Sequence, residues 1–236
     1  MFNPSPTTHP QRVRHTEDGT VHTEDAVRRS LSEERLHTFD CAVADSTRCT
    51  PLELYMWNAR ISAAFMVPLH MCEVVTRNAV SDALTRIHGP QWPWIQGFED
   101  SLPSPTSGYD PRRELRRAAA RSCSTATLIP TMSFVFWQKM FTHRFDARLW
   151  FRCGHQVYPG VDRRLPLHRF RADMHCDLEQ IRRLRNRIAH HEPIFGRALV
   201  DDLAAIQRVV GLRCPCTAAW MDSHDIVKPL LRNRPG

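Results

Sequence analysis

Residues 51–88 read PLELYMWNARISAAFMVPLHMCEVVTRNAVSDALTRIH and form the longest helical pattern in the chain. Apolar side chains recur there every three to five residues, the spacing that places them on one face of an α-helix. We expect Pro68 to kink this helix or to split it in two, and Gly89-Pro90 to end it. The residues of the pattern are Leu54, Trp57, Ile61, Ala64, Leu69, Cys72, Val75, Ala79, Ala83 and Ile87.

Shorter helical patterns surround this segment. They predict helices over residues 25–39, with Ser32 as N-cap, and over 112–126, 130–151, 169–190 and 197–210. Exposed loops are expected at 98–111 and 153–163, and no stretch shows the alternation of a strand. Residues 1–24 have little to bury and predict a disordered N-terminal tail. The sequence therefore predicts an all-α protein with one helical domain over residues 25–236.

The chain is basic, with a formal net charge of +7 and a pI of about 9.3. Such a balance favours an acidic partner: nucleic acid, a nucleotide or an anionic membrane surface. Apart from Lys139 and Lys228, all 32 basic residues are arginines. Arginine suits bidentate phosphate binding, but a GC-rich genome would enrich arginine as well.

Eight scattered cysteines and the beginning of the chain bear on its location. The first residues, MFNPSP, are followed by no apolar leader segment, and the longest apolar run, 61–69, is too short to span a bilayer. We therefore expect a cytoplasmic protein with reduced thiols and no membrane association.

The most distinctive chemistry lies at residues 185–195, which read RNRIAHHEPIF. Arg185 falls by spacing on the apolar stripe of the helix that precedes them, and a buried arginine is costly unless it is paired. Arg185 is therefore either an ion-paired structural residue or a functional one. Pro193 should turn the chain at Glu192. The stripe consists of Met174, Leu178, Ile181 and Ile188.

These side chains could cleave a phosphodiester. Arg185 could hold the non-bridging oxygens, His190 could move a proton to or from a ribose or leaving oxygen, and Asn186 could orient either group. One histidine is half of an acid–base pair, and a second copy of the chain would supply the other half. Alternatively, Arg185 pairs with Glu73, His190 caps the helix, and nothing is catalysed.

Residues 185–195 resemble the signature of Abi-like (abortive-infection) proteins, which belong to the HEPN superfamily of helical proteins, many of them metal-independent ribonucleases with an R-x(4–6)-H motif. The resemblance implies a HEPN-like helical bundle with additional helices, catalytic positions at Arg185 and His190, and a dimer that brings two motifs together. Further matching segments, which extend the resemblance over about residues 27–235, are Leu54-Tyr55-Met56-Trp57-Asn58, Glu73-Val74-Val75-x-Arg77-Asn78-Ala79, Gly89-x-x-Trp92 and Ser133-Phe134-x-Phe136-Trp137.

Three details of the resemblance stay open. Either His190 or His191 satisfies the motif's spacing. Glu73 is a candidate buried partner of Arg185, but it could equally form an ordinary helix salt bridge with Arg77. Val135 stands where the family pattern favours a small residue, which concerns local packing.

Two arginine clusters are candidate RNA-binding surfaces, although a solvated helix face is the usual explanation of such runs. One contains Arg182, Arg183 and Arg187, and the other contains Arg112, Arg113, Arg116, Arg117 and Arg121. No cofactor is expected. Neither Cys214-Pro215-Cys216 nor His190-His191-Glu192 has the spacing of a metal site, so none is predicted.

The expected function is a metal-independent HEPN-type endoribonuclease that leaves a 2′,3′-cyclic phosphate and acts in phage defence or as a toxin. Its expected partners are RNA, a second copy of the chain, and an antitoxin or a phage-derived trigger. The alternatives are a catalytically silent RNA- or partner-binding module and a nucleotide-binding regulator.

Overall fold

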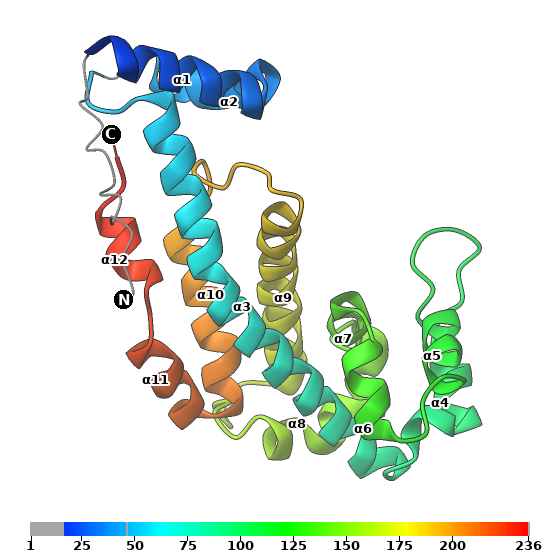
Figure 1. Ribbon diagram of the computed structural model, residues 1–236. Coiled ribbons are helices and arrows are strands. Elements are labelled where there is room, and N and C mark those ends of the chain that lie inside the picture. The colour runs from blue at the N-terminus through cyan, green and yellow to red at the C-terminus, as the bar shows by residue number, and fades with distance from the viewer. Residues whose placement is uncertain (1–16, 46, 236) are drawn as a thin grey trace, which may run out of the picture. The chain divides into compact units, whose positions relative to one another are not determined.

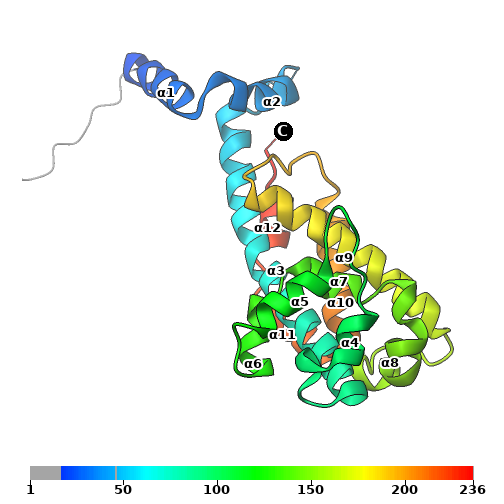
Figure 2. The same cartoon turned by 90° about the vertical axis from the view of Figure 1, so that its right-hand side faces the viewer.

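The computed structural model describes residues 17–45 and 47–235, and all regular elements within them are helices (Figures 1 and 2). The all-α prediction is confirmed. The chain divides into two compact units, one reaching to Met56 and the other running from Trp57 to Arg234. No helix in the described ranges is both long and apolar enough to cross a membrane.

The first unit contains α1 (Glu17–Leu31), α2 (Glu33–Val43) and the first turns of α3. Ser32 separates α1 from α2, and its side chain accepts a hydrogen bond from the backbone of Arg35, which confirms it as an N-cap. Arg28 joins the two helices through a bidentate contact with Asp40 at 3.0 and 2.8 Å. Because α1 begins at Glu17, residues 17–24 are helical and not part of a disordered tail. Residues 1–16 of the predicted tail lie outside the described residues.

The longest helix, α3 (Pro51–His88), has the predicted bounds. It continues through Pro68, so the alternative of two separate helices is wrong. Gly89, at φ 83°, ends it in a backbone conformation that glycine adopts without strain, and its N–H donates to Thr85 O at 2.8 Å.

Two further long helices pack in the second unit, α9 (Leu167–Ala189) and α10 (Leu199–Arg213). Helix α9 runs antiparallel to α3 (Figure 1). Burial of each large apolar side chain contributes about 1.5–3 kcal/mol, so the apolar face of α9 is a major source of stability. This face comprises Phe170, Met174, Leu178, Ile181, Leu184 and Ile188.

The middle of the chain consists of short helices where longer ones were predicted. A single helix over 130–151 is wrong, and the basic helix ends at Ala119 instead of Ala126. Polar caps restart the chain: Asp110, Ser124 and Ser133 each accept a hydrogen bond from a backbone N–H three residues later. The elements are η1 (Trp92–Trp94), α4 (Gln96–Ser101), α5 (Pro111–Ala119), α6 (Thr125–Leu128), η2 (Ile129–Thr131), α7 (Phe134–Lys139), η3 (His143–Phe145), η4 (Asp146–Trp150) and α8 (Phe151–Val157).

Buried aromatic rings hold these short helices together. Phe141 stacks on Trp150 with ring centroids 4.4 Å apart, and Tyr158 and Phe170 pack around the same indole. The indole N–H of Trp150 donates to Met140 O at 2.7 Å, so its polar atom is satisfied. Helix α4 extends into the first part of the predicted loop 98–111, where Phe98 is buried against Trp92.

Two helices that the sequence did not predict complete the unit, α11 (Pro215–Ser223) and α12 (Val227–Arg232). Cys214 caps α11 by accepting a hydrogen bond from Thr217 N, and the indole of Trp57 donates to Leu230 O at 2.9 Å. All eight cysteines lie within the described residues, and no disulfide joins them. Cys49, Cys72 and Cys153 are buried, Cys214 is half-buried, and the exposed ones are Cys41, Cys123, Cys176 and Cys216.

Candidate functional site at the end of α9

Arg185 is exposed on the last turns of α9, and the neighbouring Leu184 is fully buried in its place. The prediction that Arg185 lies on the buried stripe is therefore wrong. The buried face of α9 runs through Ile181, Leu184 and Ile188, so position 185 lies at the edge of this face.

The C-terminus of α9 ends in a Schellman motif centred on His191. His191 has φ 56°, and its N–H donates to Ile188 O at 3.0 Å while Glu192 N donates to Arg187 O at 2.8 Å. This left-handed position is usually occupied by glycine, because a Cβ atom makes it strained. Strained backbone positions concentrate at functional sites, so the positive φ of His191 makes this turn a candidate functional site.

The segment after the helix is held firmly from two sides. Arg187 donates from Nε and Nη2 to Pro193 O at 3.1 and 2.8 Å. From α3, the Oδ1 atom of Asn58 accepts hydrogen bonds from Ile194 N at 2.8 Å and from Phe195 N at 3.2 Å. Asn58 is 7% exposed, and it provides an acceptor for the buried N–H of Ile194. The turn that carries the two histidines is therefore a fixed feature of the fold.

His190 lies at the C-cap of α9 and is exposed, and Asn186, one turn earlier, is half-buried. Among the residues whose side chains are described, neither the Arg185 guanidinium nor the His190 imidazole has a hydrogen-bond or ion-pair partner. Five helical residues span about 7.5 Å along an axis. The same five steps turn about 140° around an ideal helix, so one phosphodiester would have to lie across the end of α9 to meet both side chains.

Glu73 does not pair with Arg185 within one chain. Burial raises the pKa of the Cys72 thiol to about 12, and the charges of Glu73 and Asp177 raise it further, so both carboxylates lie within coulombic range of this thiol. Arg185 lies eight residues further along α9, about 12 Å along the helix axis. Glu73 also forms no ion pair with Arg77, although both side chains are described.

Several predicted RNA-binding arginines instead hold the structure together. Arg182 makes a bidentate contact with Glu179 at 2.7 and 3.0 Å, and Arg183 joins the same carboxylate at 2.9 Å. Hydrogen bonds from Arg182 above all lower the pKa of Glu179 to about 2. Arg187 is bound to the Pro193 carbonyl, as described above. These three guanidiniums are less available to a ligand than Arg185.

The cluster on α5 divides in the same way. Arg112 donates to the backbone carbonyls of Asp100 and Leu102, and Arg116 pairs with Glu99 at 2.6 Å. Arg113 and Arg117 are exposed, and neither forms an ion pair in the described ranges. The sequence could identify the basic cluster but not this division, because the carboxylates and carbonyls involved come from another element.

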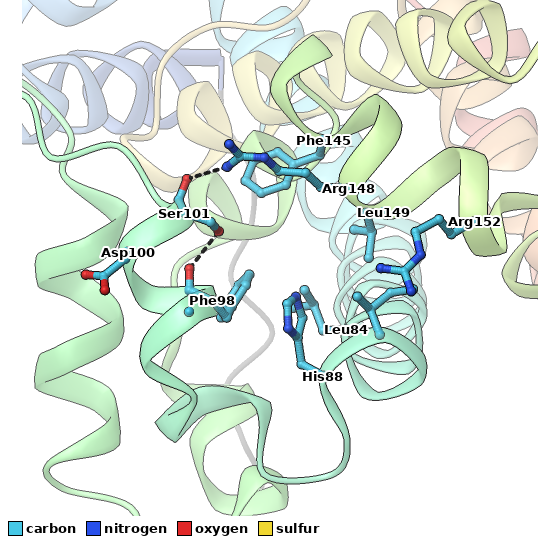
Figure 3. A pocket seen from close by; sticks show the side chains of 11 residues that line it. Leu84, His88, Phe98, Asp100, Ser101, Phe145, Arg148, Leu149 and Arg152 are labelled. Atoms are coloured by element: carbon cyan, nitrogen blue, oxygen red, sulfur yellow. Dashed lines mark hydrogen bonds between the residues drawn. The ribbon is translucent and has the colours of Figure 1, made fainter.

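A cavity of about 420 Å³ lies apart from all of the predicted site residues (Figure 3). Leu84, Phe98 and Leu149 make it mainly apolar, and Arg148 and Arg152 lie at its edge. The ring of His88 packs on Phe98 at 5.2 Å, and burial together with the charge of Arg152 lowers the pKa of its imidazole. Such a lining could take an apolar group with an acidic end. The signals for it in the sequence were weak: a histidine at a helix terminus and two arginines four residues apart.

Within the described residues, no group of three histidine, cysteine or acidic side chains is arranged to hold a metal ion. Comparisons with models of protein families, with curated proteins and with solved structures found no match to this chain. The resemblance to Abi-like proteins therefore remains a basis for a proposal.

Proposed function

We propose that the protein is a metal-independent HEPN-type endoribonuclease that acts in phage defence or as a toxin. The observation that carries the proposal is the exposure of Arg185 and His190 at one helix end, without partners in the described part of the chain. Arg182 and Arg187 on the same helix are held by a carboxylate and a carbonyl, whereas Arg185 and His190 are open to solvent and available to a ligand. The basic charge of +7 suits a phosphate-rich ligand. The role in defence rests on the resemblance alone.

In the proposed reaction Arg185 binds the non-bridging phosphate oxygens and stabilises the charge that develops in the transition state. His190 takes the proton of the ribose 2′-hydroxyl, and the 2′-oxygen attacks phosphorus. The bond to the 5′-oxygen breaks, and that oxygen receives a proton. The products are a 2′,3′-cyclic phosphate and a 5′-hydroxyl end.

A homodimer is part of the proposal, because protonation of the leaving oxygen needs a second acid. The carboxylate that follows the two histidines, Glu192, is paired with Arg187 at 3.5 Å. A twofold arrangement of two α9 ends would place two histidines around one scissile bond.

The test is cleavage of end-labelled RNA by purified protein in the presence of EDTA. Arg185→Ala and His190→Ala should each abolish cleavage, since neither side chain supports the fold. Arg169→Ala and His168→Ala are matched controls, because they remove exposed side chains of the same type near the other end of α9. Cleavage that persists in both Arg185→Ala and His190→Ala would contradict the proposal that these residues form the catalytic site of an enzyme.

The rival is a catalytically silent RNA- or partner-binding module. It is favoured by the lack of a described group that orients the His190 imidazole, which catalytic histidines usually have. It predicts salt-dependent RNA binding that His190→Ala leaves unchanged, with no cleavage by the wild-type protein.

A further inference from the structure

A groove beside α5 carries a row of three arginines. It has a volume of about 510 Å³ and is lined by Arg113, Arg117 and Arg121 together with Tyr109 and Thr127. Arg113 and Arg117 lie one turn apart on α5, and Arg121 follows in the turn after the helix. All three are exposed, and none forms an ion pair within the residues whose side chains the structure describes.

The acidic residues of the groove are already occupied. Glu114 accepts hydrogen bonds from the backbone N–H and the hydroxyl of Ser133 at 2.6 and 2.9 Å. Asp110 caps α5 through the N–H of Arg113 at 2.9 Å and also accepts from the Ser104 hydroxyl at 3.0 Å. Both carboxylates serve the fold and form no ion pair with the three arginines, so three guanidiniums against two carboxylates leave the groove with a net positive charge for a ligand.

The geometry of the row favours a chain of phosphates over one compact anion. Arg113 and Arg117 lie about 6 Å apart along the axis of α5, and Arg121 extends the row past the C-terminal end of this helix. Neighbouring phosphates of a single nucleic acid strand have a comparable separation. A small phosphate ligand would instead be held by guanidiniums that converge on one point.

We infer that the α5 groove binds the sugar–phosphate backbone of single-stranded RNA, one phosphate to each arginine. This surface belongs to a different element from Arg185 and His190, and it adds strand binding to the proposed cleavage site. The inference rests on the proposed function only for the choice of RNA as the strand. Backbone binding of this kind is electrostatic and indifferent to base sequence.

The experiment measures binding of a fluorescent 2′-O-methyl oligonucleotide, which cannot be cleaved by 2′-oxygen attack, at several salt concentrations. The variant Arg113→Gln/Arg117→Gln/Arg121→Gln should bind about tenfold more weakly or worse, with a salt slope lower by about 2, which is 0.7 for each of three lost phosphate contacts. The matched control is Arg116→Gln/Arg169→Gln/Arg208→Gln, which removes the same charge from exposed, ion-paired arginines. It should keep most of the affinity and of the slope.

Equal losses in the two triple variants would mean that only net charge matters and would overturn the inference, as would wild-type binding by the first variant. Displacement of the oligonucleotide by an equimolar nucleoside triphosphate would assign the groove to a small ligand and would also overturn it. Failure of the cleavage proposal is seen separately, because the oligonucleotide assay needs no catalysis. Circular dichroism of both variants confirms that they are folded.

Discussion

At the scale of single residues, His191 shows how the fold accepts local strain. Its φ of 56° closes the Schellman motif that ends α9 and sends the chain toward Pro193. A non-glycine residue in this conformation costs about 1–2 kcal/mol. The hydrogen bonds that Arg187 and Asn58 form with the segment after α9 offset this cost.

Comparison of His191→Gly with His191→Ala measures this strain. Both variants lack the imidazole, so the difference between them reports the backbone alone. His191→Gly should have a free energy of unfolding higher by about 1 kcal/mol than His191→Ala in urea denaturation. At His190, where φ is −92°, the order should be reversed, with alanine the more stable. The same order at both positions would contradict the assignment of strain to His191.

Between elements, the contact of Asn58 with the segment after α9 has the greatest consequence for the site. It joins α3 to residues 194 and 195 through one oxygen atom and two backbone donors. The sequence gives no reason for a polar residue, Asn58, within the apolar pattern of this helix. Its partners lie more than 130 residues away, which explains why its role could not be predicted.

Asn58→Ala should lower the free energy of unfolding by about 2–4 kcal/mol, because the buried N–H of Ile194 and the partly buried N–H of Phe195 lose this acceptor. Chemical denaturation with tryptophan fluorescence measures the change. The exposed Arg60→Ala on the same helix is the control and should change stability by no more than about 0.5 kcal/mol. A loss below that level in Asn58→Ala would show that water replaces the amide without cost.

Periodicity predicted the helices that bury a long continuous face, and it failed where helices are short. Helices α3 and α9 follow from their apolar spacing alone, since their own side chains define the face. The region from α4 to α8 could not be derived in this way, because caps such as Ser133 and packing of Trp150 against distant rings decide where each turn ends.

The candidate site was predictable in its location and not in its contacts. The composition of residues 185–195 identified the helix end. The burial of Arg185 was misjudged because the spacing from Ile181 to Ile188 allows either position 184 or position 185 on the buried face, and the structure buries Leu184. The partners of Arg182 and Arg112 depend in the same way on neighbouring residues that adopt suitable geometry only in the folded chain.

The whole molecule has 32 lysine and arginine residues and 25 acidic ones, and many of the acidic side chains form ion pairs with arginine. Protonation of the carboxylates removes these pairs and leaves a large uncompensated positive charge, because arginine stays protonated. We therefore expect acid to destabilise the protein strongly, and Glu179 to account for an identifiable share.

The pKa of Glu179 is lowered to about 2 in the folded protein from an ordinary value of 4.5. Its contribution is therefore complete above about pH 4.5 and is lost as the pH falls toward 2. Glu179→Gln should cost about 1–2 kcal/mol at neutral pH, after allowance for solvent screening, and much less near pH 3. Urea titrations at both pH values test this, with the exposed Glu34→Gln as control. A cost that does not change with pH would show that Glu179 acts by packing and not by charge.

The distribution of the cysteines gives the molecule a built-in reporter of its own integrity. A maleimide reagent should modify the side chains at 41, 123, 176 and 216 rapidly, whereas those at 49, 72 and 153 are shielded until the chain opens. Mass spectrometry of briefly labelled protein would then give the number of buried cysteines that the reagent modifies in each variant. The substitutions considered above can thus be sorted into those that disturb folding and those that alter only the surface, without a separate probe.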